Sequence, residues 1–190
     1  MRLVCFFDMM LASKLRRWSL LTGVFMVVIL VASSFLVKSI PDKSNRLIPK
    51  RLVSHLVVFK HDRRLEVWHR DTLVRAMKVC LGQDPIGPKR QEGDSKTPEG
   101  VYQLDYANPN SSFYRSFHIS YPNKADQLKA KRMGVSPGGL VMLHGCGGPG
   151  YAISQSAGID WTDGCIAVSD AQMDTLWAWI KVPLKIEIRP

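Results

Sequence analysis

The chain has 190 residues, and its 26 Lys and Arg against 16 Asp and Glu give a formal net charge of +10. Residues 1–51 hold nine of the basic residues and two of the acidic ones, so the rest of the chain is only mildly basic. This uneven charge, without a basic stripe that carries interleaved aromatic residues, argues against a nucleic-acid partner. The length suits one domain with an appendage.

Residues 18–37 contain no charged side chain. Twenty residues in a helix span about 30 Å, which is enough to cross a bilayer. Lys14, Arg16 and Arg17 precede this run, so residues 1–17 are predicted to stay in the cytoplasm. We expect a single-pass inner-membrane protein whose remaining chain lies in the periplasm. A cleaved signal peptide, which would release the domain into the periplasm, is the alternative.

A linker and a domain are predicted after the apolar run. Residues 38–51 are polar and basic with two prolines, as in a linker, and the domain covers 52–190. Short apolar or alternating runs in the domain predict strands. They lie at 55–60, 64–69, 73–79, 101–104, 117–123 (a strand ending in a turn), 140–143 and 184–189.

Helices are expected at two places. The charged segment 124–133 suits a short helix. Ser169 and Gln172 have the spacing of a capping box, which starts a second helix that ends before Pro183. Its buried face is predicted to comprise Met173, Leu176, Trp177 and Ile180. Segments 82–96 and 147–150 read as loops, the second one flexible. Many short strands with one or two short helices predict a mainly β, β-sandwich-like fold.

A His-Gly pair and a later cysteine that follows a glycine together indicate a reactive thiol. His144-Gly145 is followed by a gap and then by Thr162-Asp163-Gly164-Cys165, with seventeen residues from 145 to 161. A cysteine becomes a good nucleophile as the thiolate, and a nearby imidazole can accept its proton. A glycine before the cysteine lets another backbone or a substrate carbonyl approach closely.

This pattern resembles the L,D-transpeptidase catalytic domain (YkuD) family, in which a histidine precedes Ser/Thr-His-Gly-Cys by a similar interval. The segments 97–100 (Thr-Pro-Glu-Gly) and 117–123 are also similar to elements of that family. Asp163 stands where most members carry histidine, and Ile166-Ala167 follows the cysteine. Both departures resemble the YafK-like branch, which includes hydrolases as well as transpeptidases.

The resemblance implies an exported cysteine enzyme that acts on peptidoglycan stem peptides through an acyl-thioester, without metal or cofactor. Cys165 would be the nucleophile and His144 the general base. The backbone oxygen of Gly145 would orient the histidine. The backbone N–H groups of Gly164 and Cys165 would stabilise the oxyanion.

Four further residues are expected to contact the substrate, and two of them have a structural alternative. They are Trp161, Thr162, Asp163 and Tyr121. Asp163 would position substrate amines or cap a turn. Trp161 would form a pocket wall or belong to the core.

Several alternatives stay open at this point. The thioester could pass to an amine, on a neighbouring stem or on a lysine of a wall-attached lipoprotein. It could instead be captured by water, which makes the protein an amidase. A wall-binding module without activity is a third reading. Cys146 also follows His-Gly, but no histidine lies at the required interval before it. It would be a loop thiol or one half of a disulfide with Cys80, whose pairing the sequence leaves undecided.

Overall fold

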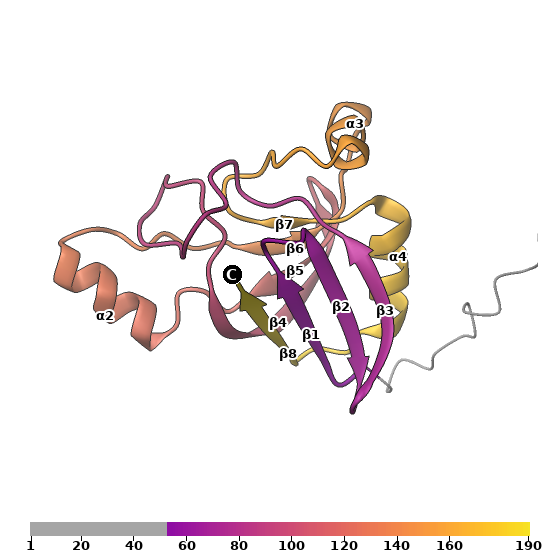
Figure 1. Cartoon of the computed structure of the whole chain (residues 1–190), viewed down its shortest axis with the longest axis horizontal. Helices are drawn as coiled ribbons and strands as arrows, with labels where there is room; N and C mark the ends of the chain where they lie inside the picture. The colour runs from indigo at the N-terminus through magenta and orange to yellow at the C-terminus, as the bar shows by residue number, and fades with distance from the viewer. Residues whose placement is uncertain (1–52) are drawn as a thin grey trace, which may run out of the picture. The chain divides into compact units, whose positions relative to one another are not determined.

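One eight-stranded sheet organises residues 53–190, which are the residues described by a computed structural model of the chain (Figure 1). The order of its strands is β3-β2-β1-β8-β4-β5-β6-β7. The strands are β1 (His55–Phe59), β2 (Arg64–His69), β3 (Thr72–Lys78), β4 (Gly100–Ser111), β5 (Tyr114–Ile119), β6 (Met142–His144), β7 (Ile166–Ala167) and β8 (Leu184–Arg189).

The predicted mainly β character is confirmed, but the prediction of a sandwich is wrong. A sandwich needs two sheets, whereas here every strand is hydrogen-bonded to its neighbour in one continuous order. The sheet is curled, so that β6 and β7 run across the direction of β1 and β2 (Figure 1). Short alternating runs look the same in both arrangements, so their pattern did not distinguish them.

Strand β8 joins the two halves of the sheet. It pairs in parallel with β1 and antiparallel with β4. Its side chains alternate between buried and more exposed positions, with Leu184, Ile186 and Ile188 in the core. The predicted bounds of β2 and β8 agree with the structure, as do those of the helix at 124–133.

Three helices lie among the described residues, one more than predicted. They are α2 (Lys124–Met133), α3 (Pro149–Ala157) and α4 (Asp170–Trp179). The capping box of Ser169 and Gln172 starts α4 as expected. Met173, Leu176 and Ile180 are buried, and Trp177 packs against the core with its ring centroid 5.1 Å from that of Phe117.

Helix α3 was missed, because the glycine run at 147–150 was interpreted as a flexible loop. Pro149 occupies the first turn of the helix and Gly158 ends it with a left-handed conformation. Proline at the start and glycine just past the end are the expected helix signals. The run of glycines around Pro149 obscured them.

The predicted cytoplasmic segment, membrane helix and linker, at 1–17, 18–37 and 38–51, lie outside the described residues. Among residues 53–190, no helix is long and apolar enough to cross a membrane. The described residues belong to one unit, Leu47–Pro190.

Candidate active site

The parallel pair of β6 and β7 brings the predicted base and nucleophile to one face of the sheet. Leu143 pairs with Ile166 and His144 with Ala167. Leu143 and Ile166 are fully buried in the core, so their neighbours His144 and Cys165 face the opposite side. Cys165 immediately precedes Ile166. It therefore lies two residues before Ala167, the residue that pairs with His144 on the neighbouring strand.

The hydrogen bond of His144 fixes its tautomer. Nδ1 lies 2.6 Å from the carbonyl oxygen of Gly145. A carbonyl oxygen only accepts, so Nδ1 carries the proton and Nε2 keeps its lone pair. Burial lowers the pKa of His144, and the bond to Gly145 opposes this effect only in part. The imidazole is thus neutral at pH 7 with a free basic nitrogen, as a general base requires.

Gly145 has no room for a side chain. A Cβ there would lie 2.6 Å from Oδ1 of Asp170 and 3.0 Å from Cβ of Tyr114. The same Oδ1 accepts a hydrogen bond of 2.7 Å from the backbone N–H of Cys146. Asp170 therefore holds the turn that aims the Gly145 carbonyl at His144, a role that the sequence did not suggest.

Aromatic rings enclose His144 on the side away from the core. The centroids of Phe113 and Trp161 lie 4.9 and 5.6 Å from the imidazole. Tyr151 of α3 stacks on Trp161 at 4.4 Å. Trp161 is therefore a wall beside the base, and this cluster excludes water from the imidazole. Phe113 and Tyr151 were missed because they lie in a hairpin and in the unpredicted α3.

The Cys165 thiol is poised beside β6. Its Sγ accepts a hydrogen bond from the Met142 N–H at 3.4 Å and donates to the Leu140 carbonyl at 3.8 Å. Within residues 53–190, no hydrogen bond joins Sγ to the His144 ring. Burial raises the pKa of Cys165, while the Met142 N–H acts in the opposite direction. Cys165 and His144 are therefore both neutral in this structure.

Thr162 braces the turn that carries the nucleophile. Its Oγ1 donates to the carbonyl of Cys165 at 2.8 Å and accepts from the N–H of Gly164 at 3.2 Å. Thr162 is also buried, so its predicted contact with substrate is replaced by a positioning role. The N–H of Gly164 is already occupied. Among the described residues, the N–H of Cys165 has no acceptor, so of the two predicted oxyanion donors it is the one that is available.

Gly164 adopts a conformation that favours glycine. Its φ is +127°, and a Cβ there would lie 2.6 Å from the carbonyl oxygen of Lys96. Lys96 belongs to the loop that the sequence predicted at 82–96. The loop therefore packs directly against the nucleophile's turn through backbone atoms.

A cavity of about 400 Å³ opens beside Cys165. Gly164, Asp163 and the segment 138–141 form part of its wall, and Lys89 and Glu92 come from the loop. Asp163 is exposed and accepts a bond of 3.3 Å from Nε2 of Gln83. This position suits substrate contact, as predicted. Lys89 was missed because its segment was assigned to a surface loop.

Tyr121 does not line this cavity. Its ring is buried, and its hydroxyl donates to the carbonyl of Pro137 at 3.0 Å. Pro137 precedes the two glycines of the cavity wall, so Tyr121 supports the wall from behind. The prediction of a direct substrate contact is therefore not supported by its place in the structure.

The other two described cysteines are free thiols in the interior. Cys80 and Cys146 are both buried, and burial raises the pKa of each to about 11. The Sγ of Cys146 donates to the carbonyl of Val168 at 3.3 Å. Neither has the exposure that a nucleophile needs. Within residues 53–190, no three His, Cys, Asp or Glu side chains are grouped to bind a metal ion.

Comparison with known proteins identifies the domain. The family model described as the L,D-transpeptidase catalytic domain (YkuD) matches residues 54–188. The chain belongs to this family. Among its relatives, YafK of Escherichia coli strain K12 is 30% identical over 113 residues, which are 56% of this chain and 44% of YafK. This likeness supports the YafK-like branch of the L,D-transpeptidase family.

Solved structures show the same fold. The helical cell shape determining protein Pgp2 of Campylobacter jejuni is 24% identical, with a TM-score of 0.54 over 72% of this chain and 47% of that one. Bd1075 of Bdellovibrio bacteriovorus is 23% identical, with a TM-score of 0.51 over 75% of this chain and 51% of its own. The chain thus spans about half the length of these L,D-transpeptidase-fold proteins.

Replacing Gly145 tests how the base is oriented. In Gly145→Ala, the new methyl group must displace Asp170 or Tyr114, which moves the carbonyl that holds His144. We expect kcat/KM to fall at least about tenfold and the free energy of unfolding to fall by about 1–3 kcal/mol. Gly148→Ala is the control, since nothing lies within 4 Å of its Cβ position and its φ is −174°. Equal losses in both variants would contradict this role.

The acid limb of the pH profile reports on the buried imidazole. Only neutral His144 can accept the thiol proton, and its lowered pKa keeps it neutral at more acidic pH than an exposed histidine. Activity should therefore fall with decreasing pH at a midpoint below 6.5, the usual pKa of histidine. The measurement is kcat/KM for a stem tetrapeptide across the acidic and neutral range. A midpoint above 6.5 would show that burial does not control this group.

Proposed function

We propose that the protein is a Cys165-dependent L,D-transpeptidase that acts on peptidoglycan stem peptides through an acyl-thioester. Membership of the family supports peptidoglycan as the substrate class. The observation that carries the mechanism is the bond from Nδ1 of His144 to Gly145. It leaves the basic Nε2 free on the face of the sheet that also holds Cys165.

In the first step, Nε2 of His144 takes the proton of the Cys165 thiol, and Sγ attacks the carbonyl between the third and fourth stem residues. The N–H of Cys165 stabilises the negative charge on the tetrahedral oxygen. The carbon–nitrogen bond then breaks, and the amine of D-Ala leaves with the proton from His144. A thioester between Sγ and the third residue remains.

In the second step, an amine attacks the thioester, and His144 accepts a proton from it. The new amide forms as the carbon–sulfur bond breaks, and the thiolate regains its proton from His144. The acceptor would be an amine of a neighbouring stem or a lysine of a wall-attached lipoprotein. Both steps consist of acyl transfer and proton transfer, which Cys165 and His144 would carry out without a cofactor.

Hydrolysis is the second candidate, and the position of Asp163 favours it. This exposed carboxylate lines the cavity next to Cys165, where it could accept a hydrogen bond from an attacking water. The enzyme would then be an amidase that shortens stems or releases lipoproteins. Stem dimers among the products would favour transfer, whereas only shortened or released species would favour hydrolysis.

Loss of the nucleophile tests the mechanism. The Cys165→Ala variant should lose turnover of a disaccharide-tetrapeptide by at least about 10³-fold. Intact mass of the wild-type protein should show an adduct equal to the substrate minus D-Ala, and the variant should not form it. Cys146→Ala is the control and should still form the adduct, because its thiol is buried away from the cavity. An adduct on Cys165→Ala would refute the assignment.

We also propose that the domain works in the periplasm, held at the inner membrane by residues 18–37. The support is the uncharged run with basic residues before it. In spheroplasts, added protease should remove a tag placed after residue 190 and leave a tag before residue 1 intact. Digestion of the tag after residue 190 alone supports this topology. Protection of both tags would contradict export.

A further inference from the structure

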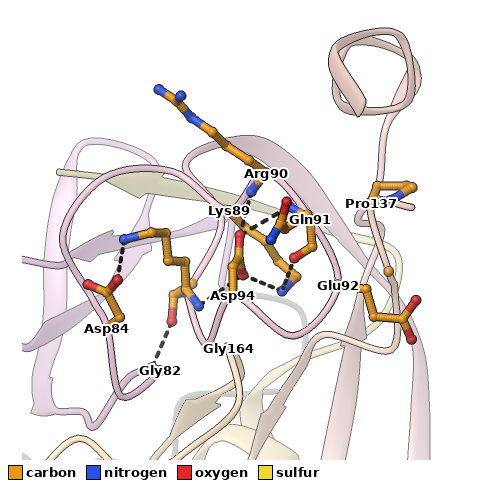
Figure 2. A network of polar contacts seen from close by, with 12 residues as sticks. Gly82, Asp84, Lys89, Arg90, Gln91, Glu92, Asp94, Pro137 and Gly164 are labelled. Atoms are coloured by element: carbon orange, nitrogen blue, oxygen red, sulfur yellow. Dashed lines mark hydrogen bonds and ion pairs between the residues drawn. The ribbon is translucent and has the colours of Figure 1, made fainter. Parts of the chain in front are cut away.

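Two buried lysines near the active site differ in how their donors are used. Lys60 donates three hydrogen bonds, to the carbonyls of Gly87 and Thr97 and to Oε1 of Glu99. Lys89 has only two acceptors. They are Oδ1 of Asp94 at 2.7 Å and the carbonyl of Gln91 at 3.2 Å (Figure 2). Within residues 53–190, the third N–H of Lys89 has no acceptor.

The spare donor lies beside the nucleophile. Lys89 lines the same cavity as Gly164 and Cys165. Its Nζ is 3.7 Å from the point where a Cβ of Gly164 would lie. The positive charge of Lys89 also favours the thiolate form of Cys165. A buried cation with an unused donor therefore lines the cavity beside the turn that carries Cys165.

The turn at Asp94 is also held by hydrogen bonds that do not involve the side chain of Lys89. Asp94 also accepts hydrogen bonds from the backbone N–H groups of Arg90, Gln91 and Lys96. These three bonds hold the turn and satisfy most of the acceptor capacity of Asp94. The side chain of Lys89 is only 5% exposed, and burial of a charge is costly. A purely structural role does not explain why one donor of this cavity-lining lysine has no acceptor.

We propose that Lys89 is a specificity-determining residue that binds a substrate carboxylate through its third N–H. An ammonium group and a carboxylate form a strong, charge-assisted hydrogen bond in a partly buried site. The inference rests on the proposed function and extends it. A stem tetrapeptide has three carboxylates, and the one on the second residue, a γ-linked D-Glu, precedes the attacked carbonyl in the stem. The other two are nearer to it along the chain. One ends the leaving D-Ala, and the other lies on the D-centre of diaminopimelate, the third residue.

The other charges of the cavity favour the D-centre. Glu92 and Asp163 also line the cavity, and both are exposed, whereas Lys89 is buried. These carboxylates would repel an isolated anion but attract an ammonium group. The D-centre carries an ammonium and a carboxylate on one carbon. It can therefore place its carboxylate on Lys89 and its ammonium towards Glu92 and Asp163.

Binding to a protein without a nucleophile tests the assignment. Full-length Cys165→Ala, kept in mild detergent, is titrated by calorimetry with and without Lys89→Met. The ligands are the disaccharide-tetrapeptide, the same compound amidated at its terminal D-Ala, and one amidated at the D-centre. Lys89→Met should weaken binding of the first two roughly 10- to 100-fold and should not change binding of the third.

Each other outcome has a defined meaning. A loss that disappears only with the D-Ala amide supports the carboxylate role and assigns it to the leaving group. Equal losses for all three ligands would show that Lys89 contacts neither amidated carboxylate and would overturn the assignment to the third or fourth residue. No loss with any ligand would overturn the proposal as a whole, as would absence of binding by Cys165→Ala. Because no turnover is needed, this result is independent of the adduct test. Absence of a thioester in the wild-type protein would refute the proposed function and leave the binding result intact.

Control variants separate charge from folding. Lys89→Arg keeps the cation and should retain most of the affinity. Arg90→Met removes the adjacent cation, which is exposed and extends away from the network, and should change the Kd less than about twofold (Figure 2). If Lys89→Met fails to fold, Lys89→Gln keeps one donor for Asp94 and should show the same dependence on the ligand. Normal affinity in Lys89→Gln would overturn the proposal.

Discussion

The pairing of β6 with β7 is the constraint on which the active site depends. Each strand is only two or three residues long, yet the parallel register places His144 and Cys165 on one face. A shift of one residue would turn one of them into the core, because side chains alternate along a strand. Leu143 and Ile166, fully buried on the other face, oppose such a shift.

Around this pair, backbone groups do most of the positioning. The Gly145 carbonyl selects the tautomer of His144, and Thr162 holds the turn before Cys165. Both turns are closely packed. A Cβ on Gly145 would contact Asp170 and Tyr114, and a Cβ on Gly164 would contact the carbonyl oxygen of Lys96. Burial lowers the pKa of His144 and raises that of Cys165, so both groups are uncharged in this structure. The rings near His144 maintain that low polarity.

Much of the fold, and the family of the domain, could be predicted from the sequence. Alternation gave β2 and β8 their bounds, and the capping box gave the start of α4, since these signals are local. The spacing from His144 to Cys165 identified the family. Two of the failures were non-local: the continuity of the sheet and the buried place of Tyr121. Two were local: the hydrogen bond from the N–H of Gly164 to Thr162, and α3, whose signals the glycine run obscured. Lys89 escaped notice because only the folded loop brings it to the cavity.

The place of β8 in the chain has a consequence for biogenesis. This strand lies between β1 and β4 and pairs with both, while an isolated bridge between Cys80 and Ala167 connects the segment after β3 to β7. A growing polypeptide that has not reached Leu184–Arg189 lacks its central strand and cannot complete the core. Stable tertiary structure must therefore wait until synthesis of the domain is nearly finished.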